Sequence, residues 1–184
     1  MKVKISQREG KRKSEISQMR HKGDIPGVIY AKGVESELVC VNGADFHEIL
    51  RNLKKGHLPT TVFELEDGQT RTAIVKDIQY HPVTYNVLHV DFMLLQDKIP
   101  VKAAVPVECT GVADCAGIKL GGFLRQVSRH VKVNCLPKDL PKQFEVDVRN
   151  MAIGHSKRIS DVAMPEGVKP LVDKQTVLVA IAKR

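Results

Sequence analysis

His89 and Asp91 lie two residues apart in the apolar segment LHVDF, residues 88–92. An aspartate close to a histidine can orient the imidazole for proton transfer, and both side chains are common metal ligands. The same side chains can instead donate and accept hydrogen bonds on a surface that binds another molecule. His81, in the preceding polar segment DIQYHPVTYN, is a further histidine within ten residues and belongs to each of these alternatives.

Catalysis or metal binding by this pair would require additional groups. Hydrolytic catalysis needs an activated Ser, Cys or Thr, and the sequence contains no GxSxG elbow or comparable signature. A metal site needs two more ligands, and only His81 is near in sequence, with Pro82 directly after it. We therefore expect no catalytic residue, no metal and no cofactor. A small metal-binding or hydrolytic protein centred on His81, His89 and Asp91 stays as an alternative.

The four cysteines are typical of a protein in a reducing compartment. None of them forms a CxxC pair, and Cys40 and Cys135 lie in strand-like apolar segments, where a free cysteine behaves as a small hydrophobic residue. The sequence shows neither a signal peptide nor an apolar segment of membrane-spanning length. We expect a cytoplasmic protein without membrane contact.

Strand alternation places the histidine and the aspartate on the same side of the chain. In LHVDFML, residues 88–94, His89 and Asp91 share one strand face with Met93. The other face is apolar and consists of Leu88, Val90, Phe92 and Leu94. On a strand, the Cβ atoms of His89 and Asp91 lie roughly 7 Å apart, which is twice the rise per residue. The pair therefore belongs either to a solvated strand face or to a surface that recognises a partner.

The charge of the chain favours a polyanionic partner. The formal net charge is +8, and residues 1–22 hold eight Lys and Arg against two Glu. Such a cluster gains free energy on nucleic acid through counterion release. RNA recognition combines cations on phosphates, here Arg8, Lys13 and Arg20, with hydrogen-bonding groups on base edges and riboses. Groups of the second kind are available if these residues share a surface: Tyr30, Gln79, Tyr80, His81, His89 and Asp91.

Two short helices are predicted in the first half of the chain. Apolar residues at helical spacing predict a helix over residues 43–55, with Asn42 as its N-terminal cap. A shorter helix is expected to begin with Ser14 as its cap and to end at Gly23.

Residues 1–95 otherwise carry strand signals. Six segments are strand-like, including IPGVIY, ELVCV and the two segments that flank a predicted turn at Asp67-Gly68. Six strands with polar turns favour a six-stranded antiparallel barrel-like domain, because closure leaves no exposed sheet edge. Residues 96–184 show strand alternation with almost no helical periodicity outside ISDVAM. We therefore expect a mainly β protein with an all-β second domain over residues 96–184.

Several of these segments together resemble one bacterial family. The order and spacing of Arg8, Lys13 and Arg20, IPGVIY at 25–30, DIQYHP at 77–82 and LHVDF at 88–92 are similar to those of the large-subunit ribosomal proteins that bind 5S rRNA. GGFLRQ, EVDV and PEGV in the second half resemble the long, two-domain form, also called the general stress protein CTC family. The resemblance covers nearly the whole chain.

This resemblance implies a non-enzymatic protein of the ribosome whose N-terminal barrel binds the loop E region of 5S rRNA. Loop E is a helix distorted by non-Watson–Crick pairs. The matching positions imply RNA-backbone contacts by Arg8, Lys13 and Arg20. They imply a strand surface that faces the RNA and holds Tyr30, Lys76, Gln79, His89 and Asp91. Glu15 and Ser17 stand where many relatives carry basic residues, so no contact is assigned to residues 14–19.

The partner of the second domain stays open at this stage. Residues 96–184 hold fifteen Lys and Arg against nine Asp and Glu, which suits 23S rRNA. Neighbouring ribosomal proteins of the large subunit are the other candidates. An alternative function for the chain is a stress-linked protein–protein adaptor that works through this domain.

Overall fold

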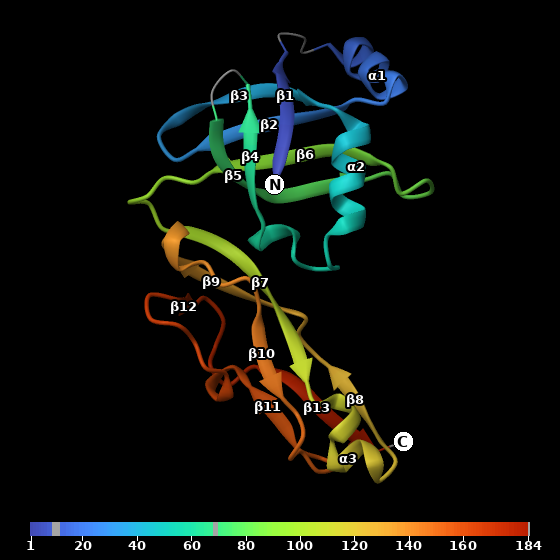
Figure 1. The fold of residues 1–184 in the computed structure, drawn as a ribbon, viewed down its shortest axis with the longest axis vertical. Coiled ribbons are helices and arrows are strands. Elements are labelled where there is room, and N and C mark those ends of the chain that lie inside the picture. The colour runs from blue at the N-terminus through green and yellow to red at the C-terminus, as the bar shows by residue number, and fades with distance from the viewer. Residues whose placement is uncertain (9–11, 68–69, 184) are drawn as a thin grey trace. The chain divides into compact units, whose positions relative to one another are not determined.

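The computed structural model describes residues 1–8, 12–67 and 70–183 (Figure 1). The chain forms two compact units, Met1–Ile99 and Pro100–Arg184, each built largely from strands. The predicted mainly β fold class is confirmed. All four cysteines are free thiols. None of the helices in the described ranges is long and apolar enough to cross a membrane.

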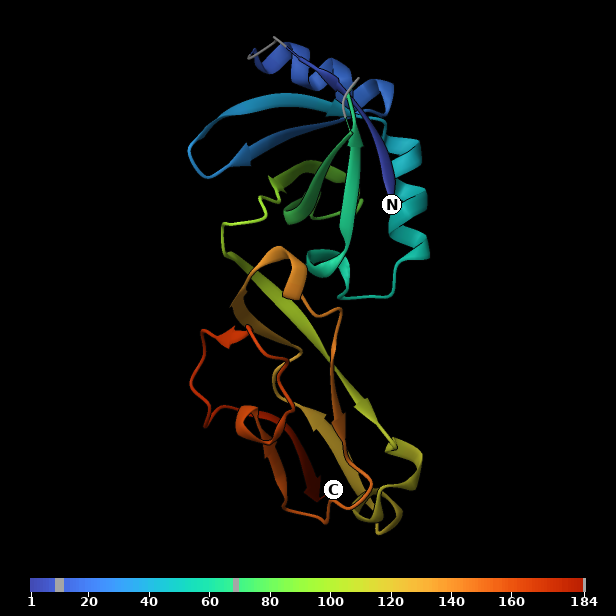
Figure 2. The same cartoon turned by 60° about the vertical axis from the view of Figure 1, so that its left-hand side comes forward.

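Six strands of the N-terminal unit close into a barrel in the order β1-β3-β2-β6-β5-β4 (Figures 1 and 2). They are β1 (Lys2–Gln7), β2 (Ile25–Ala31), β3 (Val34–Val41), β4 (Val62–Glu66), β5 (Thr70–Tyr80) and β6 (Val87–Leu94). The predicted six-stranded barrel is confirmed. Its predicted antiparallel arrangement needs one correction, because the pairs β1–β4 and β2–β6 are parallel. Barrel closure makes neighbours of strands that are distant in sequence and run in the same direction.

The predicted hairpin joins β4 to β5. The two strands are antiparallel, with pairs from Val62–Ile74 to Glu66–Thr70. Gly68 of the predicted turn lies outside the described residues. Within the barrel, β5 pairs with β4 along one edge and with β6 along the other.

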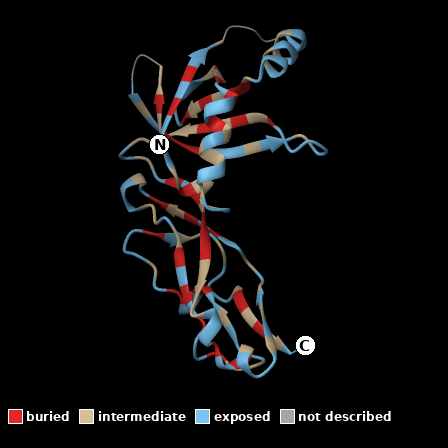
Figure 3. Ribbon diagram, turned by 45° about the vertical axis from the view of Figure 1, so that its right-hand side comes forward, coloured by how far each residue is buried: buried red, intermediate tan, exposed pale blue. Residues whose placement is uncertain are grey.

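Phenylalanine rings fill the middle of the barrel. Phe46, Phe63 and Phe92 are fully buried, and the Phe92 ring meets the other two edge-on, with centroids 6.3 Å and 6.4 Å apart. Edge-to-face contacts add about 0.5–1.5 kcal/mol to the free energy gained by burying the rings. Phe46 comes from helix α2 (Gly43–Asn52), so this helix packs on the barrel core (Figure 3).

Helix α2 begins as the sequence predicts and ends earlier. The side-chain oxygen of Asn42 accepts hydrogen bonds from the backbone N–H groups of Ala44 and Asp45, which confirms the predicted cap. The helix ends at Asn52, because the backbone of Leu53 is extended. The predicted range of 43–55 is therefore too long at its C-terminal end.

Helix α1 (Lys13–Lys22) lies outside the barrel and contacts β2 (Figure 2). Its N-terminal cap position is Arg12, so the prediction that Ser14 caps it is wrong. It ends at Gly23 as predicted, since a left-handed backbone with φ of 90° favours glycine. None of its side chains is fully buried, and Ile16 and Met19 are half-buried.

The C-terminal unit contains two sheets, in the orders β10-β7-β9-β12 and β11-β13-β8. The strands are β7 (Val101–Thr110), β8 (Gly122–Gln126), β9 (His130–Cys135), β10 (Phe144–Asp147), β11 (Ser156–Arg158), β12 (Lys169–Pro170) and β13 (Val177–Lys183). Apolar side chains of both sheets share one core, with Val105, Val133 and Leu178 fully buried. Its helical segments are short, such as α3 (Ala116–Lys119), and only Ile159–Asp161 of ISDVAM forms a helical turn. The predicted β character of this half is confirmed.

Candidate nucleic-acid interface

Strand β6 lies between β2 and β5, so its side chains have neighbours on both sides. Across to β5, Asp91 stands opposite Asp77, and His89 stands opposite Gln79. Val90, between the histidine and the aspartate, is fully buried in the barrel core. His89 and Asp91 therefore lie on the outward face of the barrel, as strand alternation predicts.

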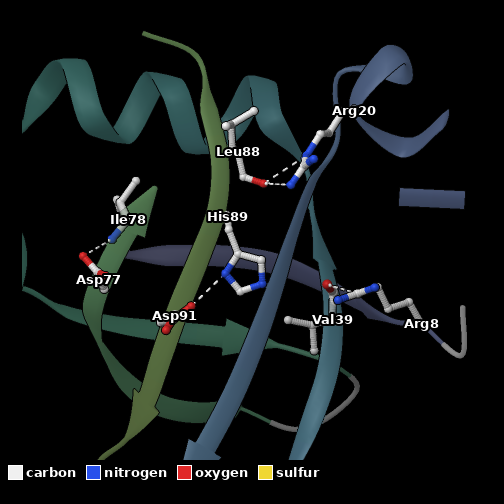
Figure 4. A network of polar contacts seen from close by, with 8 residues as sticks. All are labelled: Arg8, Arg20, Val39, Asp77, Ile78, Leu88, His89 and Asp91. Carbon is white, nitrogen blue, oxygen red and sulfur yellow. Dashed lines mark hydrogen bonds and ion pairs between the residues drawn. The ribbon is translucent and has the colours of Figure 1, made fainter. Parts of the chain in front are cut away.

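His89 and Asp91 form a hydrogen bond along this outward face (Figure 4). Nδ1 of His89 lies 2.7 Å from Oδ1 of Asp91, and the two side chains are 21% and 35% exposed. A carboxylate accepts hydrogen bonds, so Nδ1 carries the proton of this contact and Nε2 becomes the acceptor of the neutral ring. The pair thus presents fixed acceptors on a partly exposed surface.

Tyr30 of β2 adds a donor beside these acceptors. It stands opposite Met93 of β6, which is two residues from Asp91. Partial burial raises the pKa of the Tyr30 phenol, and the negative charges of Asp91 and Asp77 raise this pKa further. The phenol therefore stays protonated at neutral pH and can donate a hydrogen bond.

Asp77 is a member of this surface that the sequence does not single out. Its position directly opposite Asp91 places two carboxylates across adjacent strands. Like charges in this arrangement repel, so a cation or a hydrogen-bond donor that binds both would stabilise them. Asp77 also accepts a hydrogen bond from the backbone N–H of Ile78, at 2.9 Å. Only the strand register reveals the pair, and register depends on long-range pairing.

Strand β6 has a β-bulge at Leu88, and the backbone carbonyl of this residue is hydrogen-bonded to helix α1. The pairing between β5 and β6 skips this residue. The pairs on either side of it are Gln79–His89 and Tyr80–Val87. The carbonyl oxygen of Leu88 accepts hydrogen bonds from Nε and Nη2 of Arg20, at 3.2 Å and 2.9 Å (Figure 4). Arg20 is thereby held next to His89.

The bulge also changes which side chains enter the core. Leu88, expected on the apolar face, is only half-buried, whereas Val87 belongs to the buried core. An extra residue shifts strand alternation by one position, so the two residues exchange faces.

The remaining predicted cations lie on β5, on α1 and directly after β1. Lys76 is exposed and occupies a second bulge, between Val75 and Asp77 of β5. Lys13 is the exposed first residue of α1. Arg8 follows β1, and its Nε donates a hydrogen bond to the carbonyl of Val39 in β3, at 3.1 Å (Figure 4).

The structure therefore brings part of the predicted set together. Five residues share the adjacent strands β2, β6 and β5: Tyr30, Lys76, Gln79, His89 and Asp91. Arg20 is attached to the same place through the Leu88 carbonyl. Strand pairing does not bring Arg8 or Lys13 to these strands.

His81 lies in the turn after β5 and does not complete a metal site with His89 and Asp91. Its Nδ1 accepts hydrogen bonds from the backbone N–H groups of Val83 and Thr84, at 3.3 Å and 3.1 Å, in the turn after β5. Within the described ranges, no group of three or more His, Cys, Asp or Glu side chains could hold a metal ion. The alternative of a metal or hydrolytic site at His81, His89 and Asp91 has no support in this geometry.

Two family models match the chain, one on each unit. Residues 3–92 match the Ribosomal L25p family, and residues 100–184 match the C-terminal domain of ribosomal protein TL5. The large ribosomal subunit proteins bL25 of Chlamydia muridarum and of Chlamydia trachomatis serovar L2 are each 40% identical to this chain over 185 residues, which covers all of both chains. The bL25 protein of Chlamydia pneumoniae is 38% identical with the same coverage. The chain belongs to the ribosomal L25p family.

Membership of the L25p family confirms the resemblance found in the sequence motifs. The additional match to the TL5 C-terminal domain confirms the long form of the family. The curated L25p relatives are named as large ribosomal subunit proteins, and none of those given above is named as an enzyme.

Proposed function

We propose that this L25p-family chain is a component of the large subunit of the bacterial ribosome and that its N-terminal unit binds 5S rRNA in the loop E region. The full-length relatives named as large-subunit proteins support the first part. The outward face of β2, β6 and β5 supports the second part, because hydrogen-bonding groups from three adjacent strands lie on it.

The proposal rests on one observation: hydrogen-bond donors and acceptors are held at defined positions on this face. The contact with Asp91 holds the His89 ring and determines which ring nitrogen accepts. The neighbouring Tyr30 phenol is kept protonated and acts as a donor. Side chains held in place before binding lose less conformational entropy when the partner arrives.

This face suits the minor groove of a distorted RNA helix. The minor groove of A-form RNA is wide and shallow, and it exposes base edges and 2′-hydroxyl groups. The exocyclic amino group of guanine is a donor on this edge, which matches the carboxylates of Asp77 and Asp91. The phenol of Tyr30 and the amide of Gln79 can bond to ribose hydroxyls and base acceptors.

Cations around the face provide the sequence-independent part of the affinity. We assign phosphate contacts to Arg8, Lys13, Arg20 and Lys76, three of which precede β2 in sequence. Each phosphate contact releases counterions, so binding should weaken steeply with salt. The hydrogen-bonding face then selects the RNA, and the cations position it.

Chemical footprinting of 5S rRNA with the full chain tests the proposal. Riboses and base edges on the minor-groove side of loop E should be protected, and the remaining helices of the RNA should react as they do without protein. Protection that is absent, or that falls on another helix and spares loop E, would overturn the assignment of the RNA site.

A further inference from the structure

A groove of about 690 Å³ lies in the N-terminal unit, beyond the row of strand residues. The end of α1, the start of α2 and the turn between β5 and β6 form its walls. Its lining includes the cations Arg20 and Lys22 and three histidines, with Asp24 as the acidic member of the described lining. The histidines are His21, His47 and His81. This composition favours an anionic ligand.

Gly43 allows the walls of this groove to meet. Gly23 ends α1, and Gly43 begins α2. A Cβ atom added to Gly43 would clash with the carbonyl oxygen of Gly23, so no side chain fits at this position. The close approach of Gly23, at the end of α1, to Gly43, at the start of α2, therefore fixes the position of the basic C-terminal end of α1.

His81, in the groove lining, has one ring nitrogen that is fixed as a hydrogen-bond donor. Because Nδ1 accepts from the backbone N–H groups of Val83 and Thr84, the neutral ring carries its proton on Nε2. A ring with this tautomer donates through Nε2 without needing to be charged. The donor suits a phosphate oxygen, which only accepts hydrogen bonds.

The turn that carries His81 also contains Tyr85, an exposed residue with an uncommon backbone conformation. Tyr85 has φ of 57°, in the left-handed region that bulky residues rarely adopt, and its N–H donates to the His81 carbonyl at 2.9 Å. The His81 N–H in turn donates to the Asn86 carbonyl at 2.8 Å. These bonds hold the turn while Val83 and Tyr85 are each 77% exposed.

We infer that this groove and turn form a second RNA contact, in which Lys22 and the Nε2–H of His81 bind a backbone phosphate and Tyr85 stacks on a nearby unpaired base. Two observations support this inference. The basic groove contains the His81 ring, whose Nε2 is fixed as a hydrogen-bond donor. The hydrogen bonds of the adjacent turn keep the exposed Tyr85 in a strained backbone conformation. Combined cations and exposed aromatic rings are the usual means of binding single-stranded nucleotides. The inference rests on the proposed function, since 5S rRNA is the RNA concerned.

Tyr85→Asn in the full chain tests the stacking contact. Asparagine accepts the left-handed conformation more readily than tyrosine, so the turn is kept while the ring is lost. Affinity for 5S rRNA should fall roughly ten-fold, as expected for one lost stacking contact. Tyr85→Phe is the matched control, and it should bind as the unmodified chain does because it keeps the ring.

Lys22→Ala tests the phosphate contact through the salt dependence of binding. Loss of one phosphate contact should reduce the slope of log K against log salt concentration by about one. Lys174→Ala, an exposed lysine of the C-terminal unit, is the matched control and should leave the slope unchanged.

Both variants should be measured on 5S rRNA and on the same RNA with loop E replaced by a regular helix. Unchanged affinity for Tyr85→Asn together with an unchanged slope for Lys22→Ala would overturn the second contact, even if the unmodified chain prefers loop E. A chain that shows no preference for loop E contradicts the proposed function instead. A Tyr85→Asn variant with intact RNA affinity that no longer binds a ribosomal protein would show that the turn contacts protein, which also overturns the inference.

Discussion

The imidazole of His89 and the carboxylate of Asp91 are joined by a hydrogen bond of 2.7 Å on the outward face of β6. Across to β5, the histidine stands opposite Gln79 and the aspartate stands opposite Asp77. The two side chains therefore act as one unit, in which the carboxylate orients the ring and the ring donates to the carboxylate. This relationship determines how substitutions at the two positions should combine.

His89→Ala and Asp91→Ala should each weaken 5S rRNA binding by about ten-fold or more, which corresponds to about 1.4 kcal/mol. The double variant should lose less than the sum, because removing either partner already disturbs the other. Filter binding measures the affinities, and circular dichroism checks that the fold is intact. His130→Ala, an exposed histidine on β9, is the matched control and should bind normally.

Additive losses in this double-mutant cycle would contradict the pairing of the two side chains during binding. Unchanged affinity in both single variants would remove the pair from the RNA surface altogether.

Lys13→Ala should flatten the salt dependence of binding without changing the preference for loop E. Lys13 is exposed at the first position of α1, so its removal should leave the fold unchanged. The slope of log K against log salt should decrease by about one, the value for a single lost phosphate contact. Titrations at several salt concentrations measure it. A slope that is unchanged within error would show that Lys13 does not contact phosphate.

Arg20→Ala should loosen helix α1 in the free protein. The helix has no buried side chain, and the two hydrogen bonds to the Leu88 carbonyl attach it to β6. Loss of about 1 kcal/mol should speed amide hydrogen exchange in α1 roughly five-fold and leave the barrel strands unchanged. Gln18→Ala, an exposed residue of the same helix, serves as the control. Equal exchange in both variants would mean that Arg20 does not hold the helix.

Phe92→Ala should destabilise the N-terminal unit by about 3–5 kcal/mol, because it removes a fully buried ring from the contacts with Phe46 and Phe63. Phe92→Leu keeps much of the volume and should cost less. Urea unfolding followed by far-ultraviolet circular dichroism measures both. The core around Val105 in the C-terminal unit is independent, and its transition should not move. A loss below about 1 kcal/mol for Phe92→Ala would contradict the role of this ring in the core.

Local sequence patterns were sufficient for the strands of the barrel and for the face on which His89 and Asp91 lie. Alternation of apolar and polar residues depends only on the period of a strand, and Asn42 and Gly23 act within one helical turn. Such features need no knowledge of distant partners. The structure shows them where the sequence predicts them.

Features that depend on pairing between distant strands could not be predicted. The bulge at Leu88 arises from the pairing of β5 with β6, and it frees the carbonyl that Arg20 binds. The register that places Asp77 opposite Asp91 is likewise a property of two strands together. The parallel pairs of the barrel follow from closure and not from any single segment.

The affinity of the full chain for two RNA fragments is the most direct test of 5S rRNA recognition. One fragment contains loop E, and the other has the same length with the non-Watson–Crick pairs of loop E replaced by Watson–Crick pairs. At physiological salt the chain should bind the first fragment roughly a hundred-fold more tightly, because only that groove matches the face of β2, β6 and β5. Equal affinity for the two fragments would contradict loop E recognition.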